Sequence, residues 1–182
     1  MIFRAVEEAD LIARVRKGDV EAFNALVSRW EKRVFNYLLR LTASAEDALD
    51  LSQEAFLKAY QNIRKLDDPA RFGPWLYRIA HNEAYSLFRK RRPETALEEV
   101  GAERSPAPGF SLDLSLAVTA ALDRLNPEQR EAVVLKVYEG FKFDEMAEIL
   151  GAPVSTVKSR LYTALELLKT ELAPVGTRGK LQ

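Results

Sequence analysis

The sequence predicts an all-α protein in which two small helical domains are joined by a flexible acidic linker. Apolar residues recur every three or four positions through most of the chain, which is the period of an amphipathic helix. No segment alternates apolar and polar residues as a strand does, and no internal repeat stands out. A single glycine and no proline precede residue 69, whereas the acidic segment 93–111 holds several of both. We therefore expect domains at residues 1–92 and 112–173, a linker at 93–111 and a tail at 174–182.

The composition is that of a folded protein and excludes several kinds of site. Apolar residues make up 47% of the chain, but no run approaches the length of about 18 residues that a membrane span requires. The amino terminus has acids where a signal peptide has basic residues, so we expect a cytoplasmic protein without membrane insertion. With no cysteine and one histidine, disulfides, thiol nucleophiles and multi-histidine metal sites are excluded. We expect no cofactor. The sequence contains neither a phosphate loop nor a nucleophile elbow, so we do not expect an enzyme.

Four helices are expected in the first domain. A short helix covers about residues 8–17, and a long amphipathic helix follows it. A third begins at Ser44, a typical N-cap with Asp47 three residues on, and a fourth opens at Gly73-Pro74 and runs to about Arg91. The core-facing positions expected in the two middle helices are Phe23, Leu26, Val27, Trp30, Val34, Tyr37, Leu38 and Leu41, then Ala48, Leu49, Ala55, Phe56, Ala59, Tyr60 and Ile63.

The second domain opens with an apolar helix face and a marked helix start. Asn126 caps well and Pro127 suits a first turn, so a helix is expected to begin there, and Gly140 is expected to end it. The apolar face before this start carries Leu114, Val118, Ala121, Leu122 and Leu125.

The stretch from Phe143, FDEMAEILGAPVSTVKSRLYTALELLK, has the spacing of a helix-turn-helix. Ala147 is a small residue where two helices would touch, Gly151 permits a tight turn, and Val157 would bury the second helix. The rest of the expected buried stripe is Met146, Leu150, Val154, Leu161, Leu165 and Leu168. With Ser155 as N-cap, the start of the second helix would present cations and hydroxyls to a DNA major groove. These unburied residues are Thr156, Lys158, Ser159, Arg160 and Thr163; an ordinary charged surface helix is the alternative.

A second basic element lies at residues 71–92, RFGPWLYRIAHNEAYSLFRKRR. Its expected inward-facing residues are Leu76, Ile79, Ala80, Leu87 and Phe88. Aromatics interleaved with cations on the other side suit single-stranded nucleic acid, because bases stack on the rings and cations hold the backbone. This side carries Trp75, Tyr77, Arg78, His81, Asn82, Tyr85 and Arg89. Burial of Trp75 or Tyr77 in the core is an equal alternative to exposure. The cations at 89–92 could merely stabilise the C-terminal end of the helix. His81 is expected to be a polar surface group.

Charge is sorted into blocks, although Lys plus Arg equals Asp plus Glu at 27 each. Residues 44–68 carry three basic and six acidic side chains, 69–92 six and one, and 93–114 one and five. Such blocks suggest surfaces with different partners. On the helix from Ser44, the face opposite the apolar stripe has a leucine within a polar rim, which is typical of a docking surface. That face carries Glu46, Asp47, Asp50, Gln53, Glu54, Leu57 and Lys58.

Five motifs occur in an order that closely resembles bacterial RNA polymerase sigma factors of the extracytoplasmic-function group. They are DLIARVRKGDVEAFNALV, AEDALDLSQEAFLKAY, WLYRIAHNEA, LNPEQREAVVLK and EMAEILGAPVSTVKSRL, and they span nearly all of the chain except the linker and tail. The resemblance implies two helical domains, called regions 2 and 4, and a transcription initiation factor that directs core RNA polymerase to promoters. It also implies an anti-sigma factor as a partner.

The resemblance assigns a partner to each surface. Contact with the clamp helices of the polymerase beta-prime subunit falls on Asp50, Gln53, Glu54 and Leu57. Reading and melting of the minus-ten element, in the loop 65–72 and the helix after it, falls on Arg71, Trp75, Tyr77, Arg78, Asn82, Arg89 and Lys90. Reading of the minus-thirty-five element falls on Ser155, Thr156, Lys158, Ser159 and Arg160, in a domain that also docks on the beta flap. The acidic linker would thread the active-site and RNA-exit channels of polymerase.

The chain departs from the family pattern in two places. The run at 162–165, YTAL, stands where many members have an Arg-Ala-Arg-like run, which subtracts cations from the recognition helix. Asp67 and Asp68 lie in the expected minus-ten loop, where they would face away from DNA or shape the base pocket. Alternative interpretations are a helix-turn-helix regulator that acts without stable core polymerase binding and a helical adaptor such as an anti-sigma factor. A response regulator would need alternating strands and helices, whereas the first domain shows only a helical pattern.

Overall fold

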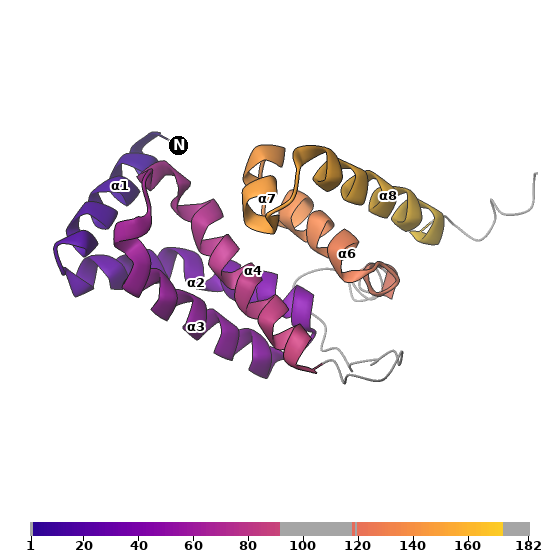
Figure 1. The fold of residues 1–182 in the computed structure, drawn as a ribbon, viewed down its shortest axis with the longest axis horizontal. Coiled ribbons are helices and arrows are strands. Elements are labelled where there is room, and N and C mark those ends of the chain that lie inside the picture. The colour runs from indigo at the N-terminus through magenta and orange to yellow at the C-terminus, as the bar shows by residue number, and fades with distance from the viewer. Residues whose placement is uncertain (1, 92–117, 119, 173–182) are drawn as a thin grey trace, which may run out of the picture.

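The computed structural model describes residues 2–91, 118 and 120–172, and within them it contains helices and turns but no strand (Figure 1). The first domain holds α1 (Ile2–Arg16), α2 (Val20–Thr42), α3 (Ala45–Asn62), the short 3-10 turns η1 (Ile63–Lys65) and η2 (Pro69–Arg71), and α4 (Phe72–Arg91). The second holds α6 (Pro127–Val133), the π-helical turn η3 (Val134–Tyr138), α7 (Phe143–Leu150) and α8 (Val154–Leu172). The all-α class is confirmed, while the expected linker and tail lie outside the described residues.

Local capping fixes the helix ends that the sequence marks. The Ser44 hydroxyl accepts the backbone N–H three residues on at 3.2 Å, and Asn126 and Gln129 cap each other reciprocally at 2.8 and 3.3 Å. Gly140 and Gly151 adopt positive φ angles of 76° and 59°, which glycine reaches without a Cβ clash, and they follow the ends of η3 and α7. The predicted helix starts at Ser44 and Asn126 and the stop at Gly140 are confirmed.

The start of α8 differs from the expectation. The Val157 N–H donates to the Pro153 carbonyl at 3.0 Å, so the helix already begins at Val154. Ser155 therefore lies inside the first turn, and the prediction that it is the N-cap is wrong. It remains exposed at the same end of the helix.

The core of the first domain forms where α2 packs on α1 and α3, and α4 packs on α3. The expected stripe of α2 is buried at Leu26, Val34 and Leu38, among others. On α3 the expectation fails at Leu49 and Tyr60, which are 50% and 38% exposed. The buried stripe of α3 is narrower than predicted, because its small residues let the neighbouring helices approach closely. Leu49 and Tyr60 each follow a buried residue directly and so lie about 100° away from it around the helix. The stripe consists of Ala48, Ser52, Ala55, Phe56 and Ala59.

The core of the second domain lies where α6 and α7 pack on α8. Val157, Leu161 and Ala164 form the buried side of α8, and Met146 is fully buried on α7. Val154 and Leu165 were expected in this stripe but are exposed. The seam instead follows a spacing of four, three and four residues through 157, 161, 164 and 168, which leaves no room for them.

Gly73 permits a close approach between α4 and α2. A Cβ at this position would lie 2.7 Å from the Trp30 ring, and that ring is held by a 3.0 Å hydrogen bond from its Nε1–H to Glu8. We expect Gly73→Ala to lower the free energy of unfolding by about 1 kcal/mol, because overpacking of about 1–3 kcal/mol outweighs a gain in helix propensity of about 1 kcal/mol. Urea unfolding measures this change. In a Trp30→Phe background the same substitution should be neutral or stabilising; a stabilising effect in the parent chain would show that the contact is not tight.

Candidate nucleic-acid and polymerase interfaces

The start of α8 gathers the predicted minus-thirty-five residues at one end of one helix. Ser155, Lys158 and Ser159 are exposed, and Thr156 is half-buried. Arg160 is also half-buried, because its guanidinium pairs with Glu128 of α6 at 2.8 Å. The two serine hydroxyls are thus open to DNA, while the exposed Lys158 ammonium lies over the Phe143 ring, 5.3 Å from its centroid. Arg160 must exchange a carboxylate for its DNA partner.

One stripe of α4 carries most of the predicted minus-ten residues. Trp75, Arg78, Asn82 and Arg89 follow one another by three, four and seven positions, so they share a face of the helix. The last three are exposed, as is Lys90, while Trp75 is half-buried with its ring 6.0 Å from that of Phe72. We call these four residues the α4 stripe. It presents one aromatic ring, one amide and two cations to solvent.

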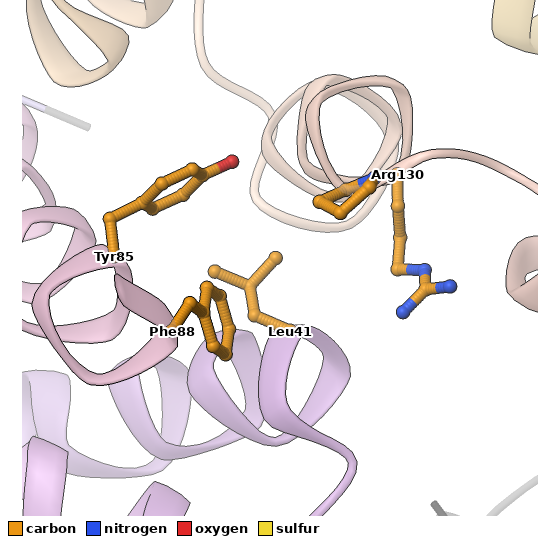
Figure 2. A pocket seen from close by; sticks show the side chains of 5 residues that line it. Leu41, Tyr85, Phe88 and Arg130 are labelled. Atoms are coloured by element: carbon orange, nitrogen blue, oxygen red, sulfur yellow. The ribbon is translucent and has the colours of Figure 1, made fainter. Parts of the chain in front are cut away.

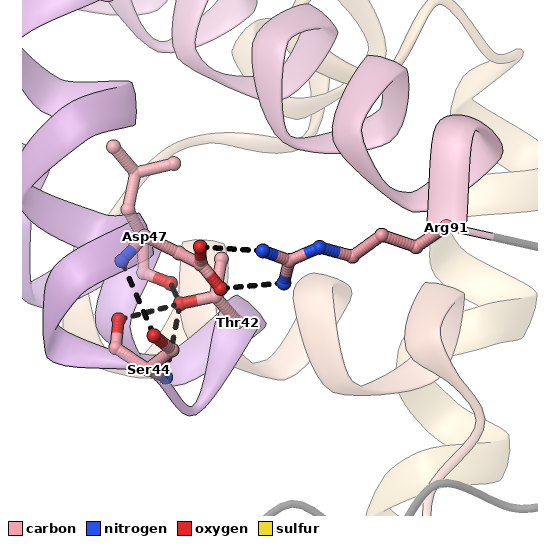
Figure 3. A network of polar contacts seen from close by, with 5 residues as sticks. Thr42, Ser44, Asp47 and Arg91 are labelled. Carbon is pink, nitrogen blue, oxygen red and sulfur yellow. Dashed lines mark hydrogen bonds and ion pairs between the residues drawn. The ribbon is translucent and has the colours of Figure 1, made fainter.

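Not every cation of this helix is available to DNA. Arg91, in the basic run at its end, donates to both carboxylate oxygens of Asp47 at 2.6 and 2.8 Å (Figure 3). This bidentate pair ties the end of α4 to the start of α3, next to the Ser44 cap, and Arg91 holds the pKa of Asp47 below its usual value. At least one cation of the basic run at the end of α4 therefore has a structural role, an alternative that the sequence left open.

Of the two alternatives left open for Tyr77, burial is confirmed and the interpretation as an exposed platform is wrong, since its side chain is fully buried. Its ring centroid lies 4.9 Å from that of Tyr37 and 4.8 Å from that of Phe141, so it packs between the two domains. The expectation that His81 is a surface group is also wrong, because its side chain is only 14% exposed. Both errors have one physical cause: the face of α4 that a single domain would leave open is covered by the second domain (Figure 1).

A buried carboxylate, Glu131 of α6, lies at the centre of this interface. Its side chain is 1% exposed and has three partners from the first domain. The Tyr37 hydroxyl donates to Oε1 at 2.5 Å, His81 Nδ1 lies 2.7 Å from the same oxygen, and the Tyr85 hydroxyl donates to Oε2 at 2.8 Å. The pKa values of the Tyr37 and Tyr85 hydroxyls are raised well above the usual value for tyrosine, mainly by burial and in addition by the nearby Glu131 carboxylate. Both hydroxyls therefore stay protonated and can donate.

Further acids of the second domain meet donors of the first. Glu139, whose side chain is 5% exposed, accepts from the Tyr77 hydroxyl at 2.7 Å and from Arg33 at 3.2 Å. On α7, Glu148 and Asp144 both pair with Arg71, the latter at 3.6 Å. We call Glu131, Glu139, Asp144 and Glu148 the acid row. It places the predicted minus-ten residue Arg71 against carboxylates.

Packing beside Glu131 is incomplete. A cavity of about 140 Å³ opens between α2, α4 and α6, lined by Leu41, Tyr85, Phe88, Pro127 and Arg130 (Figure 2). The Arg130 guanidinium donates to the carbonyls of the turn before α6, which fixes one wall. The domain interface thus combines satisfied polar contacts with a gap in its apolar part.

On α3, the four predicted core-binding residues share one face. Asp50, Gln53 and Leu57 are exposed and Glu54 is half-buried, at the spacing i, i+3, i+4 and i+7 of a single helix side. Leu57 is 51% exposed. Leu49 and Tyr60, which were expected to be buried, extend the same side at both ends. The result is an apolar strip flanked by carboxylates, which we call the α3 face.

The two aspartates of the loop between α3 and α4 differ in role. The Asp68 carboxylate accepts the Ala70 N–H at 2.9 Å and so caps η2, the turn that carries Arg71. Asp67 is exposed. Asp68 therefore shapes the loop through its backbone.

Within the described ranges, no group of three or more histidine, aspartate or glutamate side chains is arranged to hold a metal ion. None of the helices in that same part of the chain is both long and apolar enough to cross a membrane.

Two family models match the chain. The Sigma-70 region 2 model matches residues 26–94, and the Sigma-70 region 4 model matches residues 115–168, which together exceed half of the chain. The ECF RNA polymerase sigma-E factor of Haemophilus influenzae is 34% identical over 91% of this chain and 95% of its own length. The chain belongs to the ECF sigma factors. It is therefore a transcription initiation factor of the sigma-70 type.

Other relatives agree with this membership. The ECF RNA polymerase sigma factor SigW of Bacillus subtilis is 34% identical, covering 88% of this sigma factor and 94% of its own chain. Among solved structures, CnrH in complex with the cytosolic domain of CnrY matches with a TM-score of 0.69 and 27% identity, over 90% of this chain and 96% of that one. The sigma factor RpoE of Bartonella quintana, in complex with the anti-sigma factor NepR, also has a TM-score of 0.69, with 29% identity over 82% and 96% of the two chains.

Glu131 and Glu139, two interface residues of this sigma factor, were not predicted from the sequence. A signal for the first was present, because Glu131, Val134 and Leu135 share the i, i+3, i+4 spacing of one helix side and both apolar members are buried. An acid on an apolar stripe indicates a buried carboxylate with partners elsewhere. Its partners Tyr37, His81 and Tyr85 lie in the other domain, and no local pattern connects them to it.

Proposed function

We propose that this sigma factor binds core RNA polymerase through the α3 face, reads the minus-ten element with the α4 stripe and its preceding loop, and reads the minus-thirty-five element with the start of α8. The observation that supports this most strongly is that the residues of the α3 face and those of the α4 stripe each share one helix side, that the α8 residues gather at one helix end, and that all of these side chains are exposed or half-buried. The partner of the α3 face is proposed to be the beta-prime clamp helices, and that of the second domain the beta flap.

The α4 stripe suits a strand that has already begun to separate. Stacking a base on an aromatic ring such as Trp75 contributes about 1–3 kcal/mol, while Arg78 and Arg89 neutralise phosphates. Flipping a base from the duplex costs a few kcal/mol, which these contacts can offset. Arg71 and Lys90 stand at the two ends of the stripe and are proposed to hold the backbone. Tyr77 is not included, since its ring lies inside the domain interface.

The α8 contact is expected to be weak in the isolated protein. Tyr162 and Thr163 are exposed where more cations would strengthen binding to phosphates, so Lys158 and Arg160 carry most of the charge. Since each phosphate neutralised adds about 0.9 to the slope of log affinity against log salt, two cations give a shallow salt dependence. Polymerase would have to supply the remaining affinity.

An anti-sigma factor is a further proposed partner, supported by the complexes in which the solved relatives were described. The cytoplasm, where core polymerase and promoter DNA are found, is the proposed location. Catalysis is assigned to the polymerase, and this chain is proposed to contribute binding and strand separation alone.

Run-off transcription with core polymerase tests the residue assignment on α8. We expect Arg160→Ala to reduce initiation at a promoter that depends on its minus-thirty-five element by about 10- to 100-fold, since a bidentate arginine contact contributes about 1–3 kcal/mol. Core binding, measured separately, should be unchanged. Lys169→Ala, which removes an exposed cation about two and a half turns further along the same helix, is the matched control. Equal initiation by both variants would remove Arg160 from the reading surface.

A further inference from the structure

The end of α1 holds the loop 65–72, which carries the proposed minus-ten residue Arg71. The Arg16 guanidinium donates to the backbone carbonyl of Leu66, and the Arg64 guanidinium donates to the Arg16 carbonyl at 3.3 Å. α1 also packs on η1 and η2, the two short turns that lie on either side of Leu66 in the chain. The backbone of a loop that is proposed to meet DNA is therefore fixed by a helix that carries none of the predicted minus-ten residues.

The contact at the Leu66 carbonyl sets the direction of the next backbone donor. Leu66 is extended, with φ −76° and ψ 109°, and its side chain is buried, so this residue is held both at its side chain and at its carbonyl. In a trans peptide the carbonyl and the following N–H point in opposite directions, and the described part of the chain has no cis peptide. The Asp67 N–H therefore points away from Arg16. It donates no hydrogen bond to any described residue, and Asp67 is exposed.

We infer that Arg16 is a positioning residue for minus-ten recognition, which orients the peptide between Leu66 and Asp67 so that its N–H donates to a base of the separated DNA strand. The inference rests on the proposed function, because that function assigns the loop 65–72 to this strand. Backbone N–H groups donate both to phosphates and to base edges in protein–DNA complexes. The exposed carboxylates of Asp67 and Asp68 would repel a phosphate at this place, so the acceptor is assigned to a base edge.

The cost of placing an arginine at position 16 favours a role beyond stability. The Arg16 Nε is buried, and it has no hydrogen-bond partner in the described part of the chain. A buried donor without a partner destabilises a fold, whereas an apolar side chain of similar length fills the same space without that cost. Packing alone would therefore be served at least as well by methionine. The guanidinium supplies what methionine lacks, which is a donor to the Leu66 carbonyl.

Promoter discrimination by the complex of this chain with core polymerase tests the role of Arg16. Initiation is compared between a promoter with the preferred minus-ten element and a set in which each base of that element is changed singly. Arg16→Met, which removes the donors and keeps an unbranched side chain, should lower discrimination at one base position by about threefold to tenfold, the contribution of one hydrogen bond. Discrimination at the other positions should be unchanged. A loss of stability alone would lower initiation at every promoter equally and leave these ratios unchanged.

The matched control is Lys17→Ala, which removes the exposed cation next to Arg16 in the sequence. It should keep every ratio of the parent chain, and both variants should keep the parent affinity for core polymerase. Equal loss of discrimination in the two variants would show a general effect of charge and overturn the positioning role. A second set of promoters carries an uncharged methylphosphonate at single positions of the element. If the effect of Arg16→Met disappears at one of these positions and at no changed base, the acceptor is a phosphate and the assignment to a base edge is overturned.

A spectroscopic arm needs neither polymerase nor DNA. Loss of a hydrogen bond at a carbonyl changes the NMR resonances of its carbon and of the following amide nitrogen, so Arg16→Met should shift those of Leu66 and Asp67, whereas Lys17→Ala should not. Unshifted resonances would overturn the contact, whatever the transcription results. Shifted resonances with parent-like ratios at every base would overturn the positioning role while the proposed function stands. A parent chain that shows no discrimination at any base of the element would refute the proposed function and the DNA role of Arg16 with it.

Discussion

Replacing Leu57 with aspartate should reduce affinity for core RNA polymerase by roughly 30-fold or more. Leu57 is the central apolar side chain of the α3 face, with carboxylates and an amide around it, which is the arrangement of an anchor that becomes desolvated on binding. Loss of such an anchor costs about 2 kcal/mol or more, and a buried carboxylate adds a desolvation cost. Competition for core polymerase against a labelled parent chain measures the change.

The matched control is Val20→Asp, which places the same charge at an equally exposed apolar position outside the α3 face. Because both side chains are more than half exposed, neither substitution should change the free energy of unfolding by more than about 0.5 kcal/mol. Parent-like affinity in Leu57→Asp would show that polymerase binds elsewhere. Equal loss in both variants would indicate a nonspecific effect of charge.

Truncation of Tyr77 should produce the largest loss of stability. The side chain is fully buried, its ring contacts Tyr37 and Phe141, and its hydroxyl donates to Glu139. We expect Tyr77→Ala to lower the free energy of unfolding by about 3–5 kcal/mol, a large share of the roughly 5–15 kcal/mol that holds a domain together. Urea unfolding, with the slope compared between variants, measures this loss.

Tyr77→Phe separates the ring from the hydroxyl. It keeps the packing and leaves Glu139 with Arg33 as a partner, so it should cost only about 1–2 kcal/mol. If Tyr77 were instead an exposed platform for DNA bases, both variants would unfold like the parent chain and only Tyr77→Ala would lose transcription. That pattern would contradict its burial between the domains.

Local chemistry explains which elements could be predicted from the sequence. Ser44, Asn126 and Gly151 fix helix ends through contacts within a few residues, so their types and positions suffice. The start of α8 was displaced from the expectation by one backbone hydrogen bond, to Pro153, which leaves no side-chain signature.

Burial was predictable only as far as one helix period can show it. The spacing identified the main core sides of α2 and α8, but it overestimated the width of the stripes at Leu49 and Leu165, where the partner helix sets the limit. The sequence left the burial of Tyr77 undecided and misplaced His81 at the surface, because their cover comes from a domain that is distant in sequence. Periodicity records which side of a helix is polar and not which remote surface will meet it.

In the candidate sites, too, features within one helix could be predicted and contacts between the domains could not. Residues of the α3 face and the α4 stripe could be grouped from spacing alone, since each set lies on a single helix. Glu131 and its three partners come from α2, α4 and α6, and their meeting depends on how the domains dock.

This chain is expected to give core RNA polymerase its choice of start sites. The direct measurement is to map the 5′ ends of transcripts made from genomic fragments by core polymerase, with and without the purified chain. We expect a limited set of 5′ ends that require the chain and share two upstream sequence elements at constant separation. Identical 5′ ends in both reactions, despite an intact fold, would contradict the claim.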